Sequence, residues 1–464
     1  MHMVCRVKKH LTICSTKRSF WIFFGILLLY GLSRIFGVYF FGDAIFGYDT
    51  GIYRRVLQEP IEFVFFFQTV LRPFFLVGLS LDTILFGLYF LVGLWVLVFF
   101  YLCVKRYSNT NTALIASLLF AFSTVQFDFF WWFYYRNLVA LFFLLVIFYF
   151  YKKNAPVCFF SLILLISFHP LTGLFAVAIF CAYAVYKKEY YIIVWAAMGS
   201  FIAFAVNYKE FITYIDMLFD FSPTMHGVPQ IRKGELTGQF MSVSVYLREA
   251  IFYLPFGCVG VYKYAKKNVL WAIVFFFSAF LIIIQFLLYK RFFIFLDLAV
   301  IFFAALYLNS IIVFIKDRTI KYMSIFIYTS FLVLNILFFS STIAPEVSLE
   351  EVVHMVQLQD QIPEDQAILT VYNTYAPWVY GYAGRHVIIA PGMFEVKKWT
   401  MSEWEVFWTT RDHGVRNNLL SQYGLDKIYL FSGYKNIGYI EQLFLDNPKI
   451  IRVSKFVWLY TKNP

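Results

Sequence analysis

The chain has 464 residues, of which 61% are hydrophobic, 23% aromatic and only 14% charged, and its mean hydropathy is +0.71. These proportions exclude a soluble globular protein and are typical of a polytopic membrane protein. The net charge of +12 is uneven, because residues 1–344 carry +14 and residues 345–464 carry −2. A basic excess among apolar spans reflects membrane topology, so we expect no nucleic-acid partner.

Apolar runs separated by polar residues predict an all-α polytopic membrane domain over residues 1–344, followed by a small exported α/β domain over 345–464. Eleven membrane-spanning helices are expected, at residues 20–41, 83–104, 111–128, 136–151, 156–169, 171–186, 190–206, 249–262, 269–289, 291–314 and 322–341.

The loops between these spans differ in charge. The N-terminal tail and every second connection together hold 17 Lys/Arg and, as acids, only Glu189 and Asp317. Because cytoplasmic loops are enriched in Lys and Arg, the N-terminus is predicted inside and the C-terminus outside. The protein is therefore expected in the plasma (inner) membrane, with an extracellular or periplasmic C-terminal domain. Loops 42–82 and 207–248 are then also external.

The first external loop holds two acids, Asp43 and Asp49, directly after the first span. Gly47 and Gly51 flank Asp49, and small residues there permit close approach by a ligand. Tyr53 is an aromatic neighbour that can shield a carboxylate and make it a working general base. The alternative is that both acids are simply solvated.

External basic residues are the second candidate group, since they oppose the positive-inside bias. Arginine predominates among them, and its planar fork suits bidentate contact with phosphate. The hypothesis is that several clamp the phosphate of a lipid-linked substrate, and the alternative is ordinary snorkelling at the interface. They are Arg54, Arg55, Arg72, Arg136, Lys209, Arg232, Lys233, Arg248, Lys290 and Arg291.

The segment Phe168-His169-Pro170-Leu171-Thr172 forms the tip of a short helical hairpin. Its two arms would rise only about 21–24 Å, less than the ~30 Å hydrocarbon core. We therefore expect His169 below the outer surface, where ionisable groups line cavities. The alternative is a histidine that caps or packs a helix end.

Three further acids lie in or near the apolar region. Asp297 falls seven residues after Lys290, so a structural ion pair on one helix face is expected. Asp216 and Asp220, four residues apart, are candidate ligands with Asp49 for a divalent metal such as Mg²⁺ or Mn²⁺, the one cofactor considered. Acids on an external loop are also common without any metal.

The C-terminal domain has strand-like and helix-like runs. Strands are predicted at Ala367–Tyr372, His386–Ala390, Lys427–Phe431 and Phe456–Tyr460, and helices at 347–360, 402–411 and 437–446. The segment Ala376–Arg385 interleaves glycines with aromatic residues and ends in Arg385. We interpret it either as a loop that packs over sugars or as a turn between two strands.

The layout resembles the GT-C glycosyltransferases, which include oligosaccharyltransferase catalytic subunits, protein O-mannosyltransferases and lipid A aminoarabinose transferases. Four short motifs look most like those of prokaryotic members of this superfamily. The motifs are Gly-Tyr-Asp-Thr-Gly at 47–51, His-Pro-Leu-Thr at 169–172, Arg-Phe…Leu-Asp at 291–297 and Gly-Tyr-x-Gly-Arg at 381–385. The resemblance implies a polyprenyl-phosphate sugar donor, with Asp49 as catalytic acid and Asp43 second. The Trp-Trp-Asp-Tyr-Gly signature of oligosaccharyltransferases is absent, which favours transfer of one sugar.

The predicted function is therefore an inverting glycosyltransferase that moves a sugar from a lipid phosphate to a glycan, lipid or protein acceptor. Arg54, Arg55, Arg136, His169, Lys290, Arg291 and Arg385 are the candidate substrate-binding residues. Two alternatives stay open. One is a flippase or transporter of lipid-linked sugars, and the other is a polysaccharide polymerase or ligase.

Overall fold

The computed structural model describes residues 17–35, 47, 49–58, 66–209, 211–212, 240–286, 288–343, 345, 347–363, 366–384, 387–390, 399–434 and 437–462. Internal contacts divide the chain into two compact units. The helical unit comprises residues 1–40 and 62–343, and the sheet unit comprises 41–61 and 344–464. Residues 49–58, which the sequence places in an external loop of the membrane domain, thus belong to the sheet unit.

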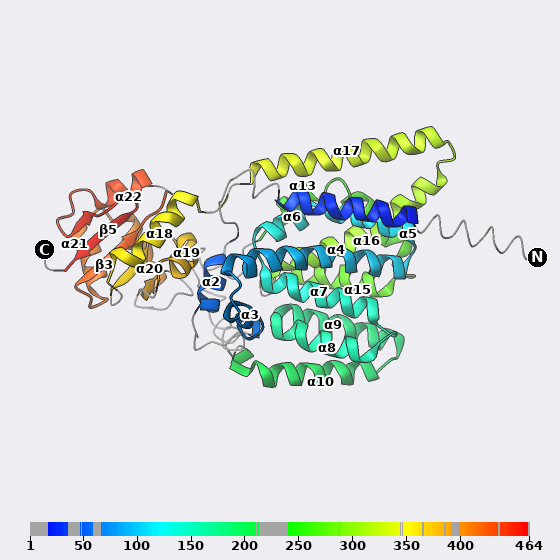
Figure 1. The fold of residues 1–464 in the computed structure, drawn as a ribbon, viewed down its shortest axis with the longest axis horizontal. Helices are drawn as coiled ribbons and strands as arrows, with labels where there is room; N and C mark the ends of the chain where they lie inside the picture. Colours follow the sequence, from blue (N-terminus) through cyan, green and yellow to red (C-terminus); the bar gives the residue numbers. More distant parts are fainter. Residues whose placement is uncertain are drawn as a thin grey trace, which may run out of the picture. The chain divides into compact units, whose positions relative to one another are not determined.

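The helical unit is a bundle of apolar helices (Figure 1). After the first helix, Lys17–Ile35, its elements are α3 (Phe66–Leu76), the π-helix η1 (Thr83–Gly87), α4 (Leu88–Tyr107), α5 (Thr110–Phe122), α6 (Thr124–Trp131), α7 (Tyr135–Phe150), α8 (Ala155–Phe168), α9 (Pro170–Lys187), α10 (Tyr191–Val206), α13 (Val243–Glu249), α14 (Leu254–Tyr264), α15 (Val269–Ile283), the 3₁₀ helix η3 (Tyr289–Phe292), α16 (Phe293–Phe314) and α17 (Arg318–Thr342).

Five helices of the described chain are long and apolar enough to cross a membrane, or six if the bent pair α5–α6 counts as one span. Four shorter apolar helices accompany them: α7, α8, α10 and α15. This supports a multi-pass protein without establishing the expected eleven spans. The most hydrophobic window of η3–α16 is 78% buried, whereas that of α17 at the edge of the bundle is 17% buried (Figure 1). α16 is therefore the core helix of this unit.

Two expected spans differ in the structure. The span at 111–128 is broken at Ser123, and its halves α5 and α6 meet at an angle of 52°. The span at 249–262 starts later, as α14, whose 11 residues rise only about 16 Å. α14 packs closely on α16, because a Cβ at Gly260 would lie 2.1 Å from the Phe303 carbonyl oxygen. Only glycine permits this backbone contact.

The sheet unit is a three-layer α/β/α domain with strand order β2-β1-β3-β5-β4. β1, β2 and β3 are parallel, and β5 is antiparallel to β3 and β4. The helices α18 and α19 share one buried cluster with the sheet, and α20, α21 and α22 share the other. The strands are β1 (Ala367–Thr370), β2 (Val387–Ile389), β3 (Lys427–Phe431), β4 (Ile450–Arg452) and β5 (Val457–Thr461).

The helices of this unit are α2 (Thr50–Gln58), α18 (Leu349–Gln361), the 3₁₀ helix η4 (Asn373–Tyr375), α19 (Ala376–Tyr382), α20 (Met401–Thr409), α21 (His413–Ser421) and α22 (Ile437–Phe444). Four strands and three helices occupy the predicted segments, while β4, α19 and α21 were missed. The interpretation of Ala376–Arg385 as a loop or turn is wrong up to Tyr382. That part is the largely buried helix α19, with Pro377 in its first turn, where proline is favourable.

The first-loop helix α2 packs directly on α19. A Cβ at Gly51 would lie 2.0 Å from the Pro377 carbonyl oxygen, and one at Gly381 would lie 2.2 Å from the Gly51 carbonyl oxygen. The two backbones therefore touch. From the sequence, Gly51 was expected to permit close approach by a ligand. In the structure, the backbone of α19 lies against it.

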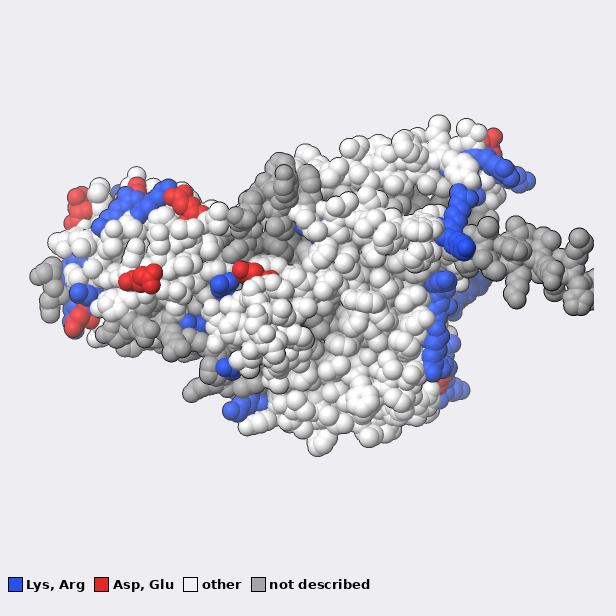
Figure 2. Space-filling model, viewed as in Figure 1, with Lys and Arg blue, Asp and Glu red and all other residues white. Residues whose placement is uncertain are grey.

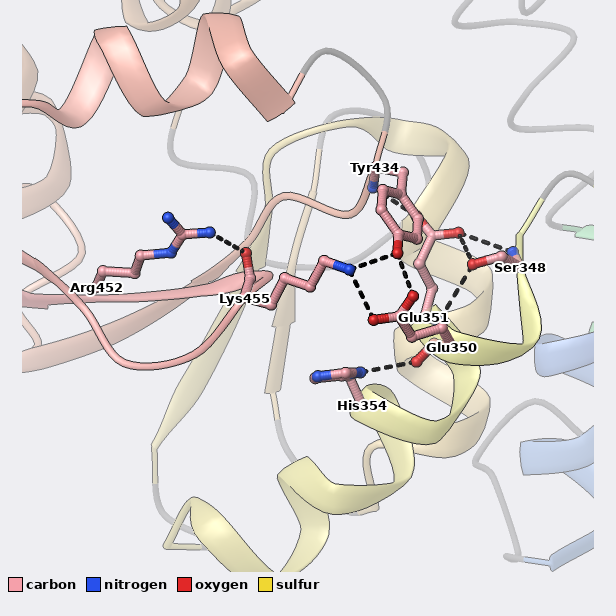
Figure 3. Close-up of polar contacts among 7 residues, drawn as sticks. All are labelled: Ser348, Glu350, Glu351, His354, Tyr434, Arg452 and Lys455. Atoms are coloured by element: carbon pink, nitrogen blue, oxygen red, sulfur yellow. Dashed lines mark hydrogen bonds and ion pairs between the residues drawn. The ribbon is translucent and has the colours of Figure 1, made fainter.

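A polar network joins the start of α18 to the end of the sheet (Figure 3). Glu351 accepts hydrogen bonds from the Ser348 amide at 2.7 Å and from the Tyr434 amide at 2.6 Å. Next to it, the Lys455 ammonium donates to Glu350 at 2.8 Å and to the Tyr434 hydroxyl at 2.6 Å. The network fixes the turn after β3 and the β4–β5 hairpin on the helix.

We predict that Gly51→Ala destabilises the sheet unit by about 3 kcal/mol, because the added methyl meets backbone atoms that cannot rotate away. Hydrogen exchange of the purified protein should then show faster exchange in α2 and α19. Gly438→Ala in α22 is the matched control, since a Cβ there meets nothing within 4 Å. Equal protection in both variants would contradict the packing.

A second prediction concerns the pH dependence of the stability that Glu350 contributes to the sheet unit. Hydrogen bonds from Lys455 and Tyr434 lower the pKa of Glu350 below its ordinary value of 4.5. Its contribution to stability is then full above the unfolded pKa and is lost as pH falls through the folded pKa. Glu350→Gln should melt at a lower temperature than the wild type at pH 7, and the difference should vanish in acid. A difference that does not depend on pH would exclude this ion pair as its cause.

Candidate active site

Arg136 lies in the first turn of α7 and is partly buried. Its Nε donates a hydrogen bond of 2.8 Å to the carbonyl oxygen of Phe168, the last residue of α8. The last carbonyls of a helix have no partner within that helix, so the guanidinium both satisfies one of them and complements the negative helix end. This contact places Arg136 beside the α8–α9 hairpin.

His169 is the single residue between α8 and α9, and it is 3% exposed. Its Nδ1 accepts the Thr172 amide at 3.1 Å and lies 2.8 Å from the Thr172 hydroxyl. The structure thus shows the helix-capping role that the sequence left as an alternative. An Nδ1 that accepts a backbone amide carries no proton, which makes Nε2 the donor of the ring.

Arg291 lies in η3, immediately before α16. Its guanidinium carbon is 5.0 Å from the ring centre of Tyr134, in the turn before α7. Its Nε is buried, without a hydrogen-bond partner among the described residues. A buried, unsatisfied donor costs about 1–3 kcal/mol, so this position favours an acceptor ligand.

Arg136 contacts Phe168, the residue before His169, and Arg291 packs on Tyr134, two residues before Arg136. Phe292, next to Arg291, also packs on Phe175 in α9, so three of the predicted residues lie at one end of the helical unit. They come from the starts of α7 and α9 and from η3, which are remote in sequence. Lys290 precedes Arg291 and is partly exposed. Two guanidiniums and an imidazole N–H form a site suited to an oxyanion such as phosphate.

A buried carboxylate anchors this end of the bundle. Asp297 is 0% exposed and accepts hydrogen bonds from Tyr253 at 2.6 Å, Gln126 at 2.9 Å and Ser123 at 3.0 Å. The predicted pairing of Asp297 with Lys290 is wrong. Lys290 lies in η3, outside the regular helix, so the seven-residue spacing does not place the two side chains on one face.

The sequence reasoning missed a second acidic pair in the same unit. Asp128 lies in α6 and Glu249 lies at the end of α13, where its carbonyl oxygen accepts a hydrogen bond of 3.2 Å from Thr124 of α6. Glu249 forms an ion pair of 3.5 Å with Arg248, yet its Oε2 is buried without a hydrogen-bond partner among the described residues. In the predicted layout Asp128 is the last residue of the span 111–128 and Glu249 is the first residue of the span 249–262, both on the outer side. An acid at the outer end of a span is the signal that could have identified them.

Asp49 belongs to the sheet unit, directly before α2. Its carbonyl oxygen accepts the Tyr53 amide at 3.0 Å, which begins the helix, and the residue is partly buried. The first-loop motif and the Gly-Tyr-x-Gly-Arg motif of the C-terminal domain therefore meet through α2 and α19.

The predicted phosphate ligands Arg54 and Arg55 both contact the α19 segment. Arg54 stacks 4.7 Å from the ring centre of Tyr382, and Arg55 lies 5.4 Å from that of Tyr380. Arg55 also donates a hydrogen bond to the Gly384 carbonyl oxygen and is 9% exposed. At least part of their charge is thus used to hold α2 on α19.

Four of the predicted site residues, Asp43, Asp216, Asp220 and Arg385, lie outside the described residues. Within the described residues, no group of three or more His, Cys, Asp or Glu side chains is arranged to hold a metal ion. The prediction of a divalent metal at Asp216 and Asp220 therefore stays a prediction.

No family model and no curated protein matches the sequence. Solved structures do match its fold. Oligosaccharyltransferase AglB from Archaeoglobus fulgidus, in complex with an inhibitory peptide and a dolichol-phosphate, aligns with a TM-score of 0.63 at 11% identity, covering 90% of this chain and 70% of that one. ArnT from Cupriavidus metallidurans bound to undecaprenyl phosphate aligns with a TM-score of 0.55 at 9% identity, covering 94% and 98%.

The apo form of the same ArnT aligns with a TM-score of 0.56 at 10% identity, covering 97% of this chain and 98% of that one. Both neighbours are membrane glycosyltransferases of the GT-C superfamily, so the resemblance seen in the motifs is confirmed at the level of the fold. The chain has the GT-C glycosyltransferase fold.

Proposed function

We propose that this protein is a membrane glycosyltransferase that takes its sugar from a polyprenyl-phosphate donor. The observation that carries the proposal is the Arg136–His169–Arg291 site, in which the Nε of Arg291 is buried without a hydrogen-bond partner among the described residues. It lies in a fold whose solved members include complexes with dolichol-phosphate and undecaprenyl phosphate. A lipid phosphate would supply an acceptor oxygen for the Nε of Arg291.

In the proposed reaction, Arg136 and Arg291 hold the phosphate of the donor, and the Nε2–H of His169 donates to a phosphate oxygen. The bond between the anomeric carbon and the phosphate oxygen breaks, and its electron pair leaves on the phosphate. Guanidiniums stabilise that charge as it develops, which is the main contribution such a site makes to catalysis. The leaving group therefore needs no proton from the protein.

We assign the general base to Asp49. Its carboxylate takes the proton of an acceptor hydroxyl, whose oxygen attacks the anomeric carbon on the face opposite the phosphate and inverts its configuration. The backbone contact of α2 with α19 supports this role, because it fixes the residue that precedes α2. Asp43 is the second candidate for the base.

We place the reaction on the outer face of the plasma membrane, with the C-terminal domain exported. The support is the charge of the loops, since the predicted cytoplasmic side holds 17 Lys/Arg. The acceptor, a glycan, lipid or protein, would then be met outside the cell. The remaining basic candidates Arg54, Arg55, Lys290 and Arg385 are assigned to substrate contacts.

Asp49→Asn should lower sugar transfer by a factor of about 10²–10⁴, because the amide cannot accept the proton. Membranes bearing the variant would be assayed for release of labelled sugar from a polyprenyl-phosphate donor. Asp446→Asn, an exposed acid of the same unit, is the control and should keep full activity. Wild-type turnover by Asp49→Asn would refute the assignment, and transport of the intact lipid across liposomes would favour a flippase.

Arg291→Gln should raise the KM for the donor by about 10–100-fold, since a charged hydrogen-bonding group is lost. Arg291→Lys should recover only part of this, because lysine keeps the charge without the fork. Free undecaprenyl phosphate should inhibit both variants less than the wild type. Arg318→Gln, at the start of α17, is the control, and an unchanged KM in Arg291→Gln would remove the arginine from the donor site.

A further inference from the structure

An apolar groove of about 490 Å³ runs along α15 in the helical unit. Its floor is one stripe of that helix, formed by Val269, Ala272, Ile273, Phe276, Phe277 and Phe280. These positions recur every three to four residues and therefore share one face. Tyr186, near the end of α9, and Ala265 and Lys266, in the turn before α15, complete the walls.

The length of the groove matches one leaflet of a bilayer. From Val269 to Phe280 the helix rises about 17 Å, and half of a ~30 Å hydrocarbon core is about 15 Å. Phe276 and Phe280 are 58% and 53% exposed, so the stripe faces outward. The groove thus has the length and the polarity for one acyl chain.

One end of the groove is basic. Lys266 lines it, and Lys187 lies 5.4 Å from the ring centre of Tyr186, which also lines it. Lys188 and Lys267 follow them in the chain, and all four ammonium groups belong to exposed residues. Lys and Arg form a band at this end of the helical unit (Figure 2).

The nearest acid in the chain does not neutralise these lysines. Glu189 follows Lys188, but its carboxylate pairs with Lys152 at 2.5 Å and accepts the Tyr151 hydroxyl at 2.5 Å. The four lysines carry no ion pair with a described residue. The basic end is therefore available to an anionic headgroup.

We propose that this groove binds an anionic phospholipid of the bilayer, with one acyl chain along α15 and the phosphate at Lys187 and Lys266. Basic pockets between membrane helices bind such headgroups, because exposed lysines attract the negative phosphate without having to be desolvated. By the charge of the loops, the lipid belongs to the cytoplasmic leaflet.

The groove is distinct from the proposed donor site. His169 lies before the first residue of α9 and Lys187 is the last, so about 27 Å of helix separate them. A donor lipid has a chain far longer than one leaflet, whereas the stripe ends at Phe280. The two proposals can therefore be tested separately, because a failure of phospholipid binding would not affect the glycosyltransferase proposal, and the reverse also holds.

Native mass spectrometry of the full chain in detergent tests this, with 1-palmitoyl-2-oleoyl-phosphatidylglycerol as probe and the phosphatidylcholine of the same chains as reference. We expect the wild type to bind phosphatidylglycerol more tightly. The double variant Lys187→Gln/Lys266→Gln should lose about 25-fold in that affinity, a factor of about five for each lysine. Lys316→Gln/Arg318→Gln, with two exposed basic residues of the α16–α17 connection, should bind like the wild type.

Ile273→Trp tests the acyl-chain part, because the larger ring fills the groove. It should bind less of both lipids while its melting temperature stays that of the wild type. Equal affinity of the wild type for both lipids, or an unchanged affinity in the Lys187/Lys266 variant, would overturn the proposal. So would displacement of bound phosphatidylglycerol by equimolar undecaprenyl phosphate, since the groove would then belong to a polyprenyl lipid.

Discussion

The polar end of the helical unit depends on how Asp297 is satisfied. A carboxylate in an apolar interior is unfavourable by several kcal/mol unless its oxygens are hydrogen-bonded. Here the Tyr253 hydroxyl donates to one oxygen, and Ser123 and Gln126 donate to the other. Ser123 is the break between α5 and α6, Gln126 lies in the first turn of α6, and Tyr253 is the residue before α14. One side chain of α16 therefore holds the α5–α6 break and the start of α14 against the core helix. Arg291 comes six residues before Asp297, and Arg136 follows the break through α6.

In the sheet unit, two glycines rather than a buried carboxylate hold segments together that are far apart in the sequence. α2 and α19 are far apart in the sequence, and their backbones touch at Gly51 and Gly381. Each glycine belongs to a motif that the sequence presented as a ligand-binding loop. The contact gives these glycines a packing reason, so they are not by themselves evidence of a ligand. What is left for chemistry in the first motif is Asp49, the residue before the helix.

Where the sequence predicted the structure, it did so through long-range regularity. Apolar runs located most helices of the bundle, and β-branched runs located four strands. The failures are local. The break at Ser123 interrupts an apolar run without proline or glycine. Ser123 accepts the Gln126 amide as the N-cap of α6 and donates a hydrogen bond to Asp297, 174 residues away. Pro377 and Gly381 were read as turn formers, but proline is favourable in the first turn of a helix and Gly381 is needed against α2. Such partners are set by tertiary contacts that no window of the sequence contains.

The candidate site was predicted in a similar way. Arg136 and Arg291 stood out as external arginines that oppose the positive-inside bias, and His169 stood out at the tip of a short hairpin. Contacts with Phe168 and Tyr134 place the three in one region, and their role in binding stays a prediction. Spacing alone misled for Asp297, because Lys290 lies in a 3₁₀ turn and does not follow the helical period. Asp128 and Glu249 were passed over because each is a single acid at the edge of an apolar run. Only the fold shows that the helices carrying them, α6 and α13, are in contact.

The two ends of α9 show how one fold uses positive charge in two ways. Near its start lies Arg291 of η3, which packs on an aromatic ring and has a buried Nε. A ligand that binds there would lose hydration and gain directional hydrogen bonds from the guanidinium. At its end, Lys187 and Lys266 are exposed beside an apolar groove. A lipid headgroup bound there would keep much of its hydration, and burial of the acyl chain in the groove would add to the binding free energy. The first arrangement can select a phosphate by its geometry. The second selects a ligand only by its negative charge and its acyl chain, and an anionic phospholipid has both.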